Sequence, residues 1–344
     1  MRLLMITRKI DQSDERVGFF SDWVKKIADH VEHLTVITWQ PSSAEGLPGN
    51  VSLVQLPQNT VLKIITLKWQ LLRRLGGVDG VFCHMNPEYT IIAAPIARLF
   101  GKKVVSWYTH GTVSLRARVM EKLANVVLTA SAESFRVKSK KVQVTGHGID
   151  VEQFKSIGRQ PSAELQLLTV GRISPTKDYE TMIKALDILQ VGGDTQVRLD
   201  IIGAPGLAEH AGYFESLKKM TAAMGLSGQV TFVGALPHLE IPGRLQNADV
   251  FVNLSGTGSV DKAVLEAMAC GCIVLTSNEA FQLMLPPTLM VEQNKPTLLA
   301  DKIQWLLSLP HHEKNALRQQ LRQIVVENHN LDQLAVKIVE QFEK

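Results

Sequence analysis

The chain has 344 residues and a formal net charge of +4 at neutral pH, a length that accommodates two domains of roughly 100–200 residues each. Hydrophobic residues make up 45% and charged residues 20% of the chain, which excludes disordered, collagen-like and coiled-coil proteins. Three cysteines, Cys83, Cys270 and Cys272, are too few and too scattered for a disulfide framework or a four-cysteine zinc site. We therefore expect a protein of a reducing compartment that folds without disulfides or structural metal.

The apolar runs are too short for a secretory signal or a membrane span. Leu3–Thr7 falls short of the roughly 7–15 apolar residues of a secretory signal, and Thr90–Phe100 falls short of the roughly 20 residues of a spanning helix. Basic residues concentrate in the first half, where residues 1–150 hold 20 Lys and Arg against 12 Asp and Glu. We expect a cytoplasmic protein that is either free in solution or peripheral on the inner face of the cytoplasmic membrane.

Residues 1–154 alternate apolar strand-like runs with helical patterns. The expected strands are Leu3–Thr7, Leu34–Thr38, Val81–Cys83, Val104–Trp107 and Val126–Thr129. The expected helices are Gly18–Val31, Val61–Leu75 and Tyr89–Phe100. Because strands that alternate with helices form parallel sheets with crossover helices, this half predicts a Rossmann-like domain.

A polar connector, Lys155–Glu164, separates this half from a second one of the same kind. Its expected strands are Leu165–Val170, Val197–Ile202, Val230–Phe232, Val250–Asn253 and Ile273–Thr276. Its expected helices are Tyr179–Leu189, Ala211–Met224 and Lys262–Ala269, followed by a helical tail from Pro296 with breaks at Pro310 and Asn330. We predict an α/β fold of two doubly wound domains facing a cleft, 1–154 and 155–328, with a last helix, 329–344, that packs on the first domain.

Several common nucleotide motifs are missing. The segment Thr7–Val17 contains no glycine, so it lacks the G-x-G-x-x-G fingerprint of dinucleotide-binding domains. The Gly101-Lys102 pair is followed by Lys103 rather than by the Ser or Thr of a P-loop. No two aspartates are spaced i, i+2, the pattern that would hold a divalent ion against a diphosphate. A bound nucleotide would need protein cations to neutralise its phosphates.

Two cations follow the first strand of the second half. Gly171-Arg172 and Lys177 come between Leu165–Val170 and the next helix, which places them at the carboxyl edge of a parallel sheet, where such sheets bind ligands. An arginine fork and a lysine point charge can together bind a diphosphate and stabilise it as a leaving group. The alternative is that both are solvated loop residues.

A glycine-rich loop, Ser255–Gly258, follows the strand Val250–Asn253 and leads into a helix that contains Glu266. The first turn of such a helix offers free N–H groups and a positive dipole end to an anion. Glu266 could accept both hydroxyls of a ribose, or it could be a solvated residue of an amphipathic helix.

Six segments occur together in a characteristic order: Gly146–Asp150 with Phe154, Gly171–Lys177, Leu199–Gly203, Val230–Gly234, Ala248–Asn253 and Leu265–Gly271. With these segments the chain resembles the retaining glycosyltransferases of family 4 (glycosyl transferases group 1), which have the GT-B architecture of two Rossmann-like domains. The resemblance covers most of the chain. It implies transfer of a sugar from a nucleoside diphosphate donor to an acceptor hydroxyl with retention at the anomeric carbon.

The resemblance also implies a set of site residues. Arg172 and Lys177 would hold the diphosphate, and Glu266 would hold the ribose. His110 would contact the donor sugar beside the reacting carbon. The rest of the donor site would comprise the backbone of Val264 and Leu265 at the distal phosphate, the loop residues Thr257, Gly258 and Asp261, and Gly234 and Leu236 around the base.

One position departs from the family pattern. The family usually has two glutamates seven residues apart, but counting back from Glu266 reaches Gly258, which has no side chain. Asp261 either replaces the missing carboxylate at the sugar or acts as the N-cap of the following helix.

The expected acceptor side lies in the first domain, at Arg8, Lys9, His84 and Asn86, which follow predicted strands. The acceptor would be a glycan or a lipid-linked glycan of the cell envelope, and the donor would be UDP- or GDP-linked. No cofactor, metal or nucleic acid is expected. The basic, apolar stretch Lys63–Arg74 is either a helix on an anionic membrane surface or a core helix with a basic outer face.

Two other functions stay open from the sequence. A sugar-nucleotide epimerase of the same architecture would bind the same donor, and a catalytically silent scaffold would account for the absence of a carboxylate at Gly258. Turnover of donor without acceptor would indicate the epimerase, and binding without turnover would indicate the scaffold.

Overall fold

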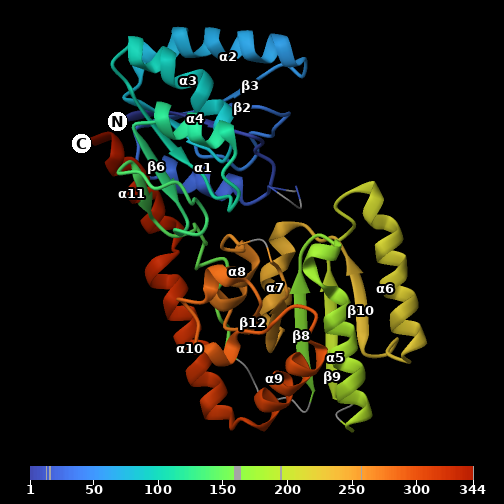
Figure 1. The fold of residues 1–344 in the computed structure, drawn as a ribbon. Coiled ribbons are helices and arrows are strands. Elements are labelled where there is room, and N and C mark those ends of the chain that lie inside the picture. The colour runs from blue at the N-terminus through green and yellow to red at the C-terminus, as the bar shows by residue number, and fades with distance from the viewer. Residues whose placement is uncertain (13, 15–16, 159–163, 194–195, 257, 344) are drawn as a thin grey trace. The chain divides into compact units, whose positions relative to one another are not determined.

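The computed structural model describes residues 1–12, 14, 17–158, 164–193, 196–256 and 258–343. The chain divides into two compact units (Figure 1). Unit 1 comprises Met1–Asp150 and Asn328–Lys344, and unit 2 comprises Val151–Glu327. These bounds lie close to the expected divisions after residues 154 and 328.

Unit 1 is built on a seven-stranded parallel sheet of order β3-β2-β1-β4-β5-β6-β7. Its strands are β1 (Arg2–Thr7), β2 (His33–Thr38), β3 (Val51–Gln55), β4 (Gly80–His84), β5 (Lys103–Trp107), β6 (Val126–Thr129) and β7 (Val142–Val144). The central strand β1 carries four consecutive apolar residues that are fully buried, as expected of a strand covered on both faces.

The helices of unit 1 are α1 (Phe20–Ala28), α2 (Thr60–Arg74), α3 (Pro87–Leu99), α4 (Leu115–Leu123) and α11 (Leu331–Glu343). The last of them, α11, packs against α1, where Lys26 Nζ lies 2.8 Å from Asp332 Oδ1. Two glycines allow the C-terminal segment to approach. A Cβ on Gly146, at φ +82°, would lie 1.8 Å from the Asn328 carbonyl oxygen, and one on Gly148 would lie 2.6 Å from Leu331. The predicted return of the last helix to the first domain is therefore confirmed.

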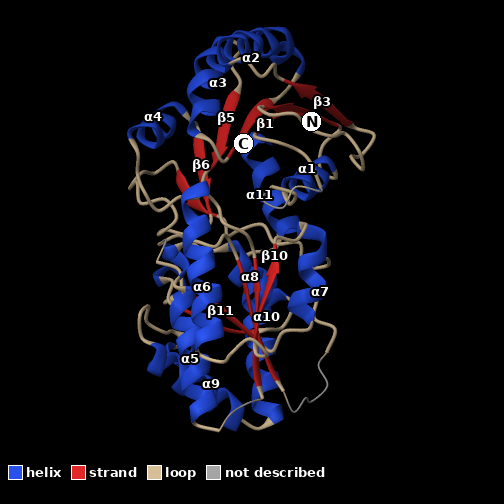
Figure 2. Cartoon of the chain, turned by 90° about the vertical axis from the view of Figure 1, so that its right-hand side faces the viewer, coloured by secondary structure: helices blue, strands red, loops and turns tan. Residues whose placement is uncertain are grey.

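Unit 2 is built on a five-stranded parallel sheet of order β10-β9-β8-β11-β12, with helices on both faces (Figure 2). Its strands are β8 (Leu165–Val170), β9 (Val197–Ile202), β10 (Val230–Gly234), β11 (Val250–Asn253) and β12 (Ile273–Thr276). Its helices are α5 (Tyr179–Val191), α6 (Ala211–Ala223), α7 (Ile241–Gln246), α8 (Lys262–Ala269), α9 (Pro296–Ser308) and α10 (His311–Asn328). Both units are doubly wound Rossmann-like folds, as predicted.

The strand order of unit 2 reverses direction at β8. The chain runs from β8 outward to β9 and β10, then returns to add β11 and β12 on the other side of β8. The loops that leave β8 and β11 therefore diverge at the carboxyl edge of the sheet. In open α/β sheets this point of reversal is where ligands bind.

The sequence reading missed four elements: β3, α4, β7 and α7. Strands β3 and β7 lie at the two edges of their sheet and are half-buried or exposed, so they lack the continuous apolar run of a central strand. The short helix α7 contains Pro242 and Gly243, which are poor helix signals in a sequence. Tertiary contacts, rather than local propensity, stabilise β3, β7 and α7, whereas α4 has the local signals of a helix, including Ser114 as N-cap.

Candidate functional site

The candidate site lies at the point of reversal in unit 2. Its first part is the loop 171–178, between β8 and α5, and its second part is formed by residues 254–256 and 258–261, between β11 and α8. Strands β8 and β11 are paired neighbours, so both loops leave the same edge of the sheet side by side.

The Gly171-Arg172 turn is held by two contacts. Gly203 has φ +149°, and a Cβ there would lie 1.9 Å from the Gly171 carbonyl oxygen, so the close approach of β9 requires glycine. The buried Tyr179 hydroxyl lies 3.2 Å from the Gly171 carbonyl and 3.3 Å from the Arg172 carbonyl, and donates to them. The Arg172 side chain is exposed and extends past Gly206. The backbone is thus fixed while the guanidinium stays accessible to an anion.

The second predicted cation, Lys177, joins the two loops. Its Nζ lies 2.6 Å from Asp261 Oδ2, and both side chains are less than one-fifth exposed. Asn253, at the end of β11, also donates to Asp261 Oδ2, at 3.0 Å. The carboxylate thus receives two side-chain donors, one from the loop that follows β8 and one from the end of β11.

Asp261 is also the N-cap of α8, where it accepts the Ala263 N–H. The N-cap reading of the sequence is therefore confirmed. Burial acts to raise the pKa of Asp261, but the Lys177 charge and the hydrogen bonds outweigh it and hold the pKa below its ordinary value. Asp261 is consequently ionised at neutral pH and supplies a negative charge beside Lys177.

Glu266 lies in a buried cluster with two basic side chains. Its Oε1 lies 2.8 Å from His238 Nε2 and is also paired with Lys262 Nζ. Burial acts to raise the pKa of Glu266, but the Lys262 charge and the His238 hydrogen bond lower it to about 2. The Lys262 ammonium lies 5.5 Å from the centre of the Phe154 ring. The predicted ribose ligand is therefore an ionised carboxylate that already has two partners.

Three residues of the candidate site were not predicted from the sequence: Asn253 beside Asp261, and Lys262 and His238 beside Glu266. Lys262 precedes Glu266 by four residues, a spacing that places both side chains on one helix face and could have revealed the pair. His238 comes from the segment after β10, and no local pattern connects it with Glu266.

The remaining predicted donor residues lie around this edge of unit 2. Gly234 ends β10 at φ +87°, and Leu236 is half-buried in the segment that follows. Gly258 has φ +65°, and Thr257 lies outside the described residues. Val264 and Leu265 are fully buried, and the Val264 N–H donates to the Asp261 carbonyl at 3.2 Å. An anion at α8 would therefore meet a first turn that Asp261 already caps.

Four of the predicted residues of unit 1 are at least partly exposed. The exposed His110 follows β5, and its Nδ1 accepts the Thr112 N–H at 3.2 Å. Arg8 bonds to Gln40, Asn86 bonds to the Tyr89 hydroxyl, and Lys9 is paired with Asp11 and Asp14.

His84 is a core residue of unit 1, not an exposed contact for an acceptor. It is 0% exposed, its Nδ1 lies 3.1 Å from the Thr7 hydroxyl, and its ring packs against Phe20 and Trp23. Burial and the neighbouring His147 lower the pKa of His84 to about 3, so the imidazole is neutral. His84 is the last residue of the central strand β4, and its side chain faces the core rather than the carboxyl edge of the sheet.

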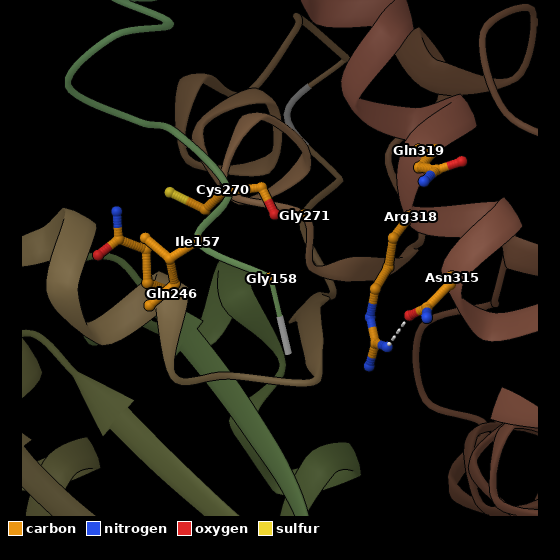
Figure 3. Close-up of a pocket in the computed structure, with 9 residues that line it drawn as sticks. Ile157, Gly158, Gln246, Cys270, Gly271, Asn315, Arg318 and Gln319 are labelled. Carbon is orange, nitrogen blue, oxygen red and sulfur yellow. Dashed lines mark hydrogen bonds between the residues drawn. The ribbon is translucent and has the colours of Figure 1, made fainter. Parts of the chain in front are cut away.

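Unit 2 has a separate hollow of about 170 Å³ at the opposite edge of its sheet, where α7 and α8 end (Figure 3). Arg318 reaches into it, and its guanidinium bonds to Asn315 at 3.0 Å and to Asp249 at 3.1 Å. These polar groups bond one another, and the hollow is far from the point of reversal. Among the residues that the structure describes, no group of three His, Cys, Asp or Glu could hold a metal ion.

The family described as "Glycosyl transferases group 1" matches residues 150–328. The chain is 25% identical over 247 residues to a GDP-mannose-dependent alpha-(1-6)-phosphatidylinositol monomannoside mannosyltransferase of Mycobacterium tuberculosis, covering 61% of this chain and 60% of that protein. It is 27% identical over 236 residues to a D-inositol 3-phosphate glycosyltransferase of Frankia alni, covering 63% and 55%. The matched region thus spans no more than about 60% of these relatives.

Solved structures resemble the whole chain. HepE of Anabaena in complex with UDP matches with a TM-score of 0.80, 17% identity and full coverage of both chains. Sucrose-phosphate synthase of Thermosynechococcus elongatus matches with a TM-score of 0.74, 16% identity and coverage of 99% and 98%. At this identity the likeness shows the fold alone, which is the predicted GT-B fold.

Proposed function

The chain belongs to the glycosyl transferases group 1, and we propose that it transfers a sugar from a nucleoside diphosphate sugar to an acceptor hydroxyl. The proposed reaction retains the configuration at the anomeric carbon and uses no metal. The observation that carries the proposal is the position of Arg172 and Lys177, two cations on the loop that leaves β8 where the sheet order reverses.

The proposed chemistry depends on charge that develops on the leaving group. When the bond from the anomeric carbon to the diphosphate oxygen breaks, negative charge accumulates on the diphosphate. The exposed Arg172 fork and the Lys177 ammonium would stabilise that charge. The acceptor oxygen would attack from the face that the diphosphate leaves, and its proton would pass to the departing diphosphate oxygen. His110, carried by unit 1, stays a predicted contact of the donor sugar.

Donor binding would require an exchange of partners. In the structure Lys177 is neutralised by Asp261, and Glu266 is held by Lys262 and His238. We infer that the diphosphate shares Lys177 with Asp261. The ribose hydroxyls would donate to the Glu266 oxygen that is paired with Lys262 in the structure. The displaced Lys262 ammonium would then add a third cation near the nucleotide.

The donor would be UDP- or GDP-linked, because HepE was crystallised with UDP and the mycobacterial relative is named as GDP-mannose-dependent. The acceptor would be a glycan or a lipid-linked glycan of the cell envelope. The name of that relative, which includes a phosphatidylinositol mannoside, supports a glycolipid. We accordingly expect the protein to act in the cytoplasm, at the inner face of the membrane.

The direct test is isothermal titration of the protein with UDP, GDP, ADP and CMP in buffer with a metal chelator. One nucleotide should bind the wild type, and Arg172→Ala should weaken that binding roughly tenfold or more, since an arginine bidentate to phosphate is lost. Arg198→Ala is the matched control, because Arg198 is an exposed arginine of unit 2 paired with Glu164. Equal weakening by both variants would contradict the assignment.

Turnover separates the remaining alternatives. Release of nucleotide that depends on an acceptor, with retained stereochemistry in the product, is expected for the transferase. Conversion of the donor without acceptor would indicate an epimerase, and tight binding without turnover over a broad acceptor panel would indicate a scaffold.

A further inference from the structure

Helix α2 of unit 1 has an apolar face that no part of the described chain covers. Five large apolar side chains on it are more than half exposed: Val61 65%, Leu62 54%, Ile65 57%, Trp69 51% and Leu72 52%. At 100° per residue these positions fall within one 100° sector of the helix. They define the outer face of α2, which lies along the top of unit 1 in Figure 1.

The opposite side of the same helix is part of the core. Leu67 and Leu71 are 0% exposed and pack with residues of α3 such as Ala93 and Ala97. The helix is therefore apolar on both faces. A helix of this kind is normally buried all round, so the outer face of α2 is expected to have a partner. A core helix with a basic outer face, the alternative left open by the sequence, does not match this distribution.

Basic residues border the outer face, and acidic residues are absent. Lys68 lies on one side of the apolar sector and Arg73 on the other, both exposed, and the Arg73 guanidinium lies 5.3 Å from the centre of the Trp69 ring. The sequence has no Asp or Glu between Gly46 and Val78. The partner of this face must therefore be apolar in its middle and anionic at its border.

We propose that the outer face of α2 docks on an anionic lipid bilayer, with the apolar side chains at the level of the acyl chains and Lys68 and Arg73 at the phosphates. Such a helix, with apolar and aromatic side chains between basic ones, binds in the plane of the interface. A second copy of the chain fits less well. A two-fold contact through α2 would bring Lys68 and Arg73 of both copies together without an acidic residue on the helix to pair with them.

No described helix is long and apolar enough to cross a bilayer, so this contact would be peripheral. It lies on unit 1 and does not involve the Arg172 and Lys177 loop of unit 2. Bilayer binding can therefore be measured separately from nucleotide binding. Under the proposed function, it would bring the enzyme to a lipid-linked acceptor.

The test is co-sedimentation of the full chain with phosphatidylcholine vesicles, with and without phosphatidylglycerol, at low and high salt. The wild type should bind the anionic vesicles at low salt and much less at high salt, since the Debye length falls from roughly 10 Å at 0.1 M to roughly 3 Å at 1 M. Ile65→Ser with Trp69→Ser should lower the partition coefficient roughly tenfold or more, and Lys68→Gln with Arg73→Gln should lower it only on anionic vesicles.

The matched control is Val191→Ser with Leu283→Ser, which removes two highly exposed apolar side chains from unit 2, at 84% and 94% exposure. This control should bind vesicles as the wild type does. Circular dichroism and nucleotide titration establish that every variant is folded, and they report on the proposed function separately.

Three outcomes would overturn the proposal. The wild type could remain in the supernatant with anionic vesicles, or it could bind neutral and anionic vesicles equally. Light scattering could instead show a dimer that Ile65→Ser with Trp69→Ser converts to monomer, which would assign the face to a second copy.

Discussion

Lys177 and Asp261 connect the two loops that diverge at the reversal point of unit 2, with Nζ 2.6 Å from Oδ2. The same carboxylate caps α8 and accepts a hydrogen bond from Asn253. One acidic side chain thus holds a strand end, a helix start and the cation proposed to bind the donor diphosphate. We therefore expect Asp261 to compete with a donor phosphate for Lys177.

Asp261→Asn should therefore tighten the binding of the preferred nucleoside diphosphate by roughly fivefold to tenfold. The substitution removes the competing charge, while the asparagine oxygen can still cap α8. Titration calorimetry measures the change. Asp301→Asn, on the exposed surface of α9, alters the net charge equally and should have no effect. Weaker binding by the Asp261 variant would mean that Asp261 positions Lys177 or contacts the sugar.

Lys262→Met should destabilise unit 2 at neutral pH by roughly 2–4 kcal/mol, because it leaves the buried Glu266 carboxylate with His238 alone. The Glu266 pKa of about 2 lies below its ordinary 4.5, so the ionised form contributes stability above pH 4.5 that is lost as the pH falls toward 2. Removal of Lys262 raises that pKa, and the difference from wild type should shrink below pH 4.5. Urea unfolding at several pH values measures this.

The control is Lys184→Met on the exposed surface of α5, which should change the free energy of unfolding by less than about 0.5 kcal/mol. A difference between the Lys262 variant and wild type that stays constant from pH 7 to roughly pH 3 would contradict the assigned pairing.

Gly203→Ala should destabilise unit 2 by roughly 2–4 kcal/mol and weaken nucleotide binding at the same time. The new Cβ would lie 1.9 Å from the Gly171 carbonyl oxygen at a φ of +149°, so the turn that carries Arg172 must move. The control is Gly243→Ala in α7. A Cβ on Gly243 would have no neighbouring atom within 4 Å, so this substitution should be neutral or slightly stabilising. Wild-type nucleotide affinity in the Gly203→Ala variant would show that the turn is not held by this contact.

His329 should make unit 1 sensitive to acid. Its Nδ1 accepts the backbone N–H of His147 at 2.9 Å, so the buried ring is neutral. Burial and the nearby Lys337 charge lower the pKa of His329 to about 4. A histidine with a lowered pKa stabilises the fold above its unfolded pKa of about 6.5, and this stability is lost as the pH falls toward 4. We expect a loss of roughly 2–3 kcal/mol over that range.

In His329→Asn, the asparagine oxygen can accept the His147 N–H but does not titrate. The variant should therefore lose less stability than wild type between pH 6.5 and 4, measured by urea unfolding. A variant with the wild-type pH dependence would place the titration elsewhere, for example at His84, whose pKa is lowered to about 3.

Local sequence patterns determined the central strands and the two doubly wound units, because a strand buried on both faces must be a continuous apolar run. They also determined the turn that carries Arg172, which directly follows such a strand. Edge strands such as β3 and β7 were missed, since half of their surface faces solvent and their residues are mixed.

Long-range contacts decided the rest. The pairing of Lys177 with Asp261 joins residues 84 positions apart, and that of His238 with Glu266 joins residues 28 apart. The burial of His84 and the exposure of the outer face of α2 likewise depend on which helices pack over each position. A sequence determines where apolar runs and charged groups occur along the chain, but only the packed fold determines which of them meet, because charge pairing and burial depend on distance in space.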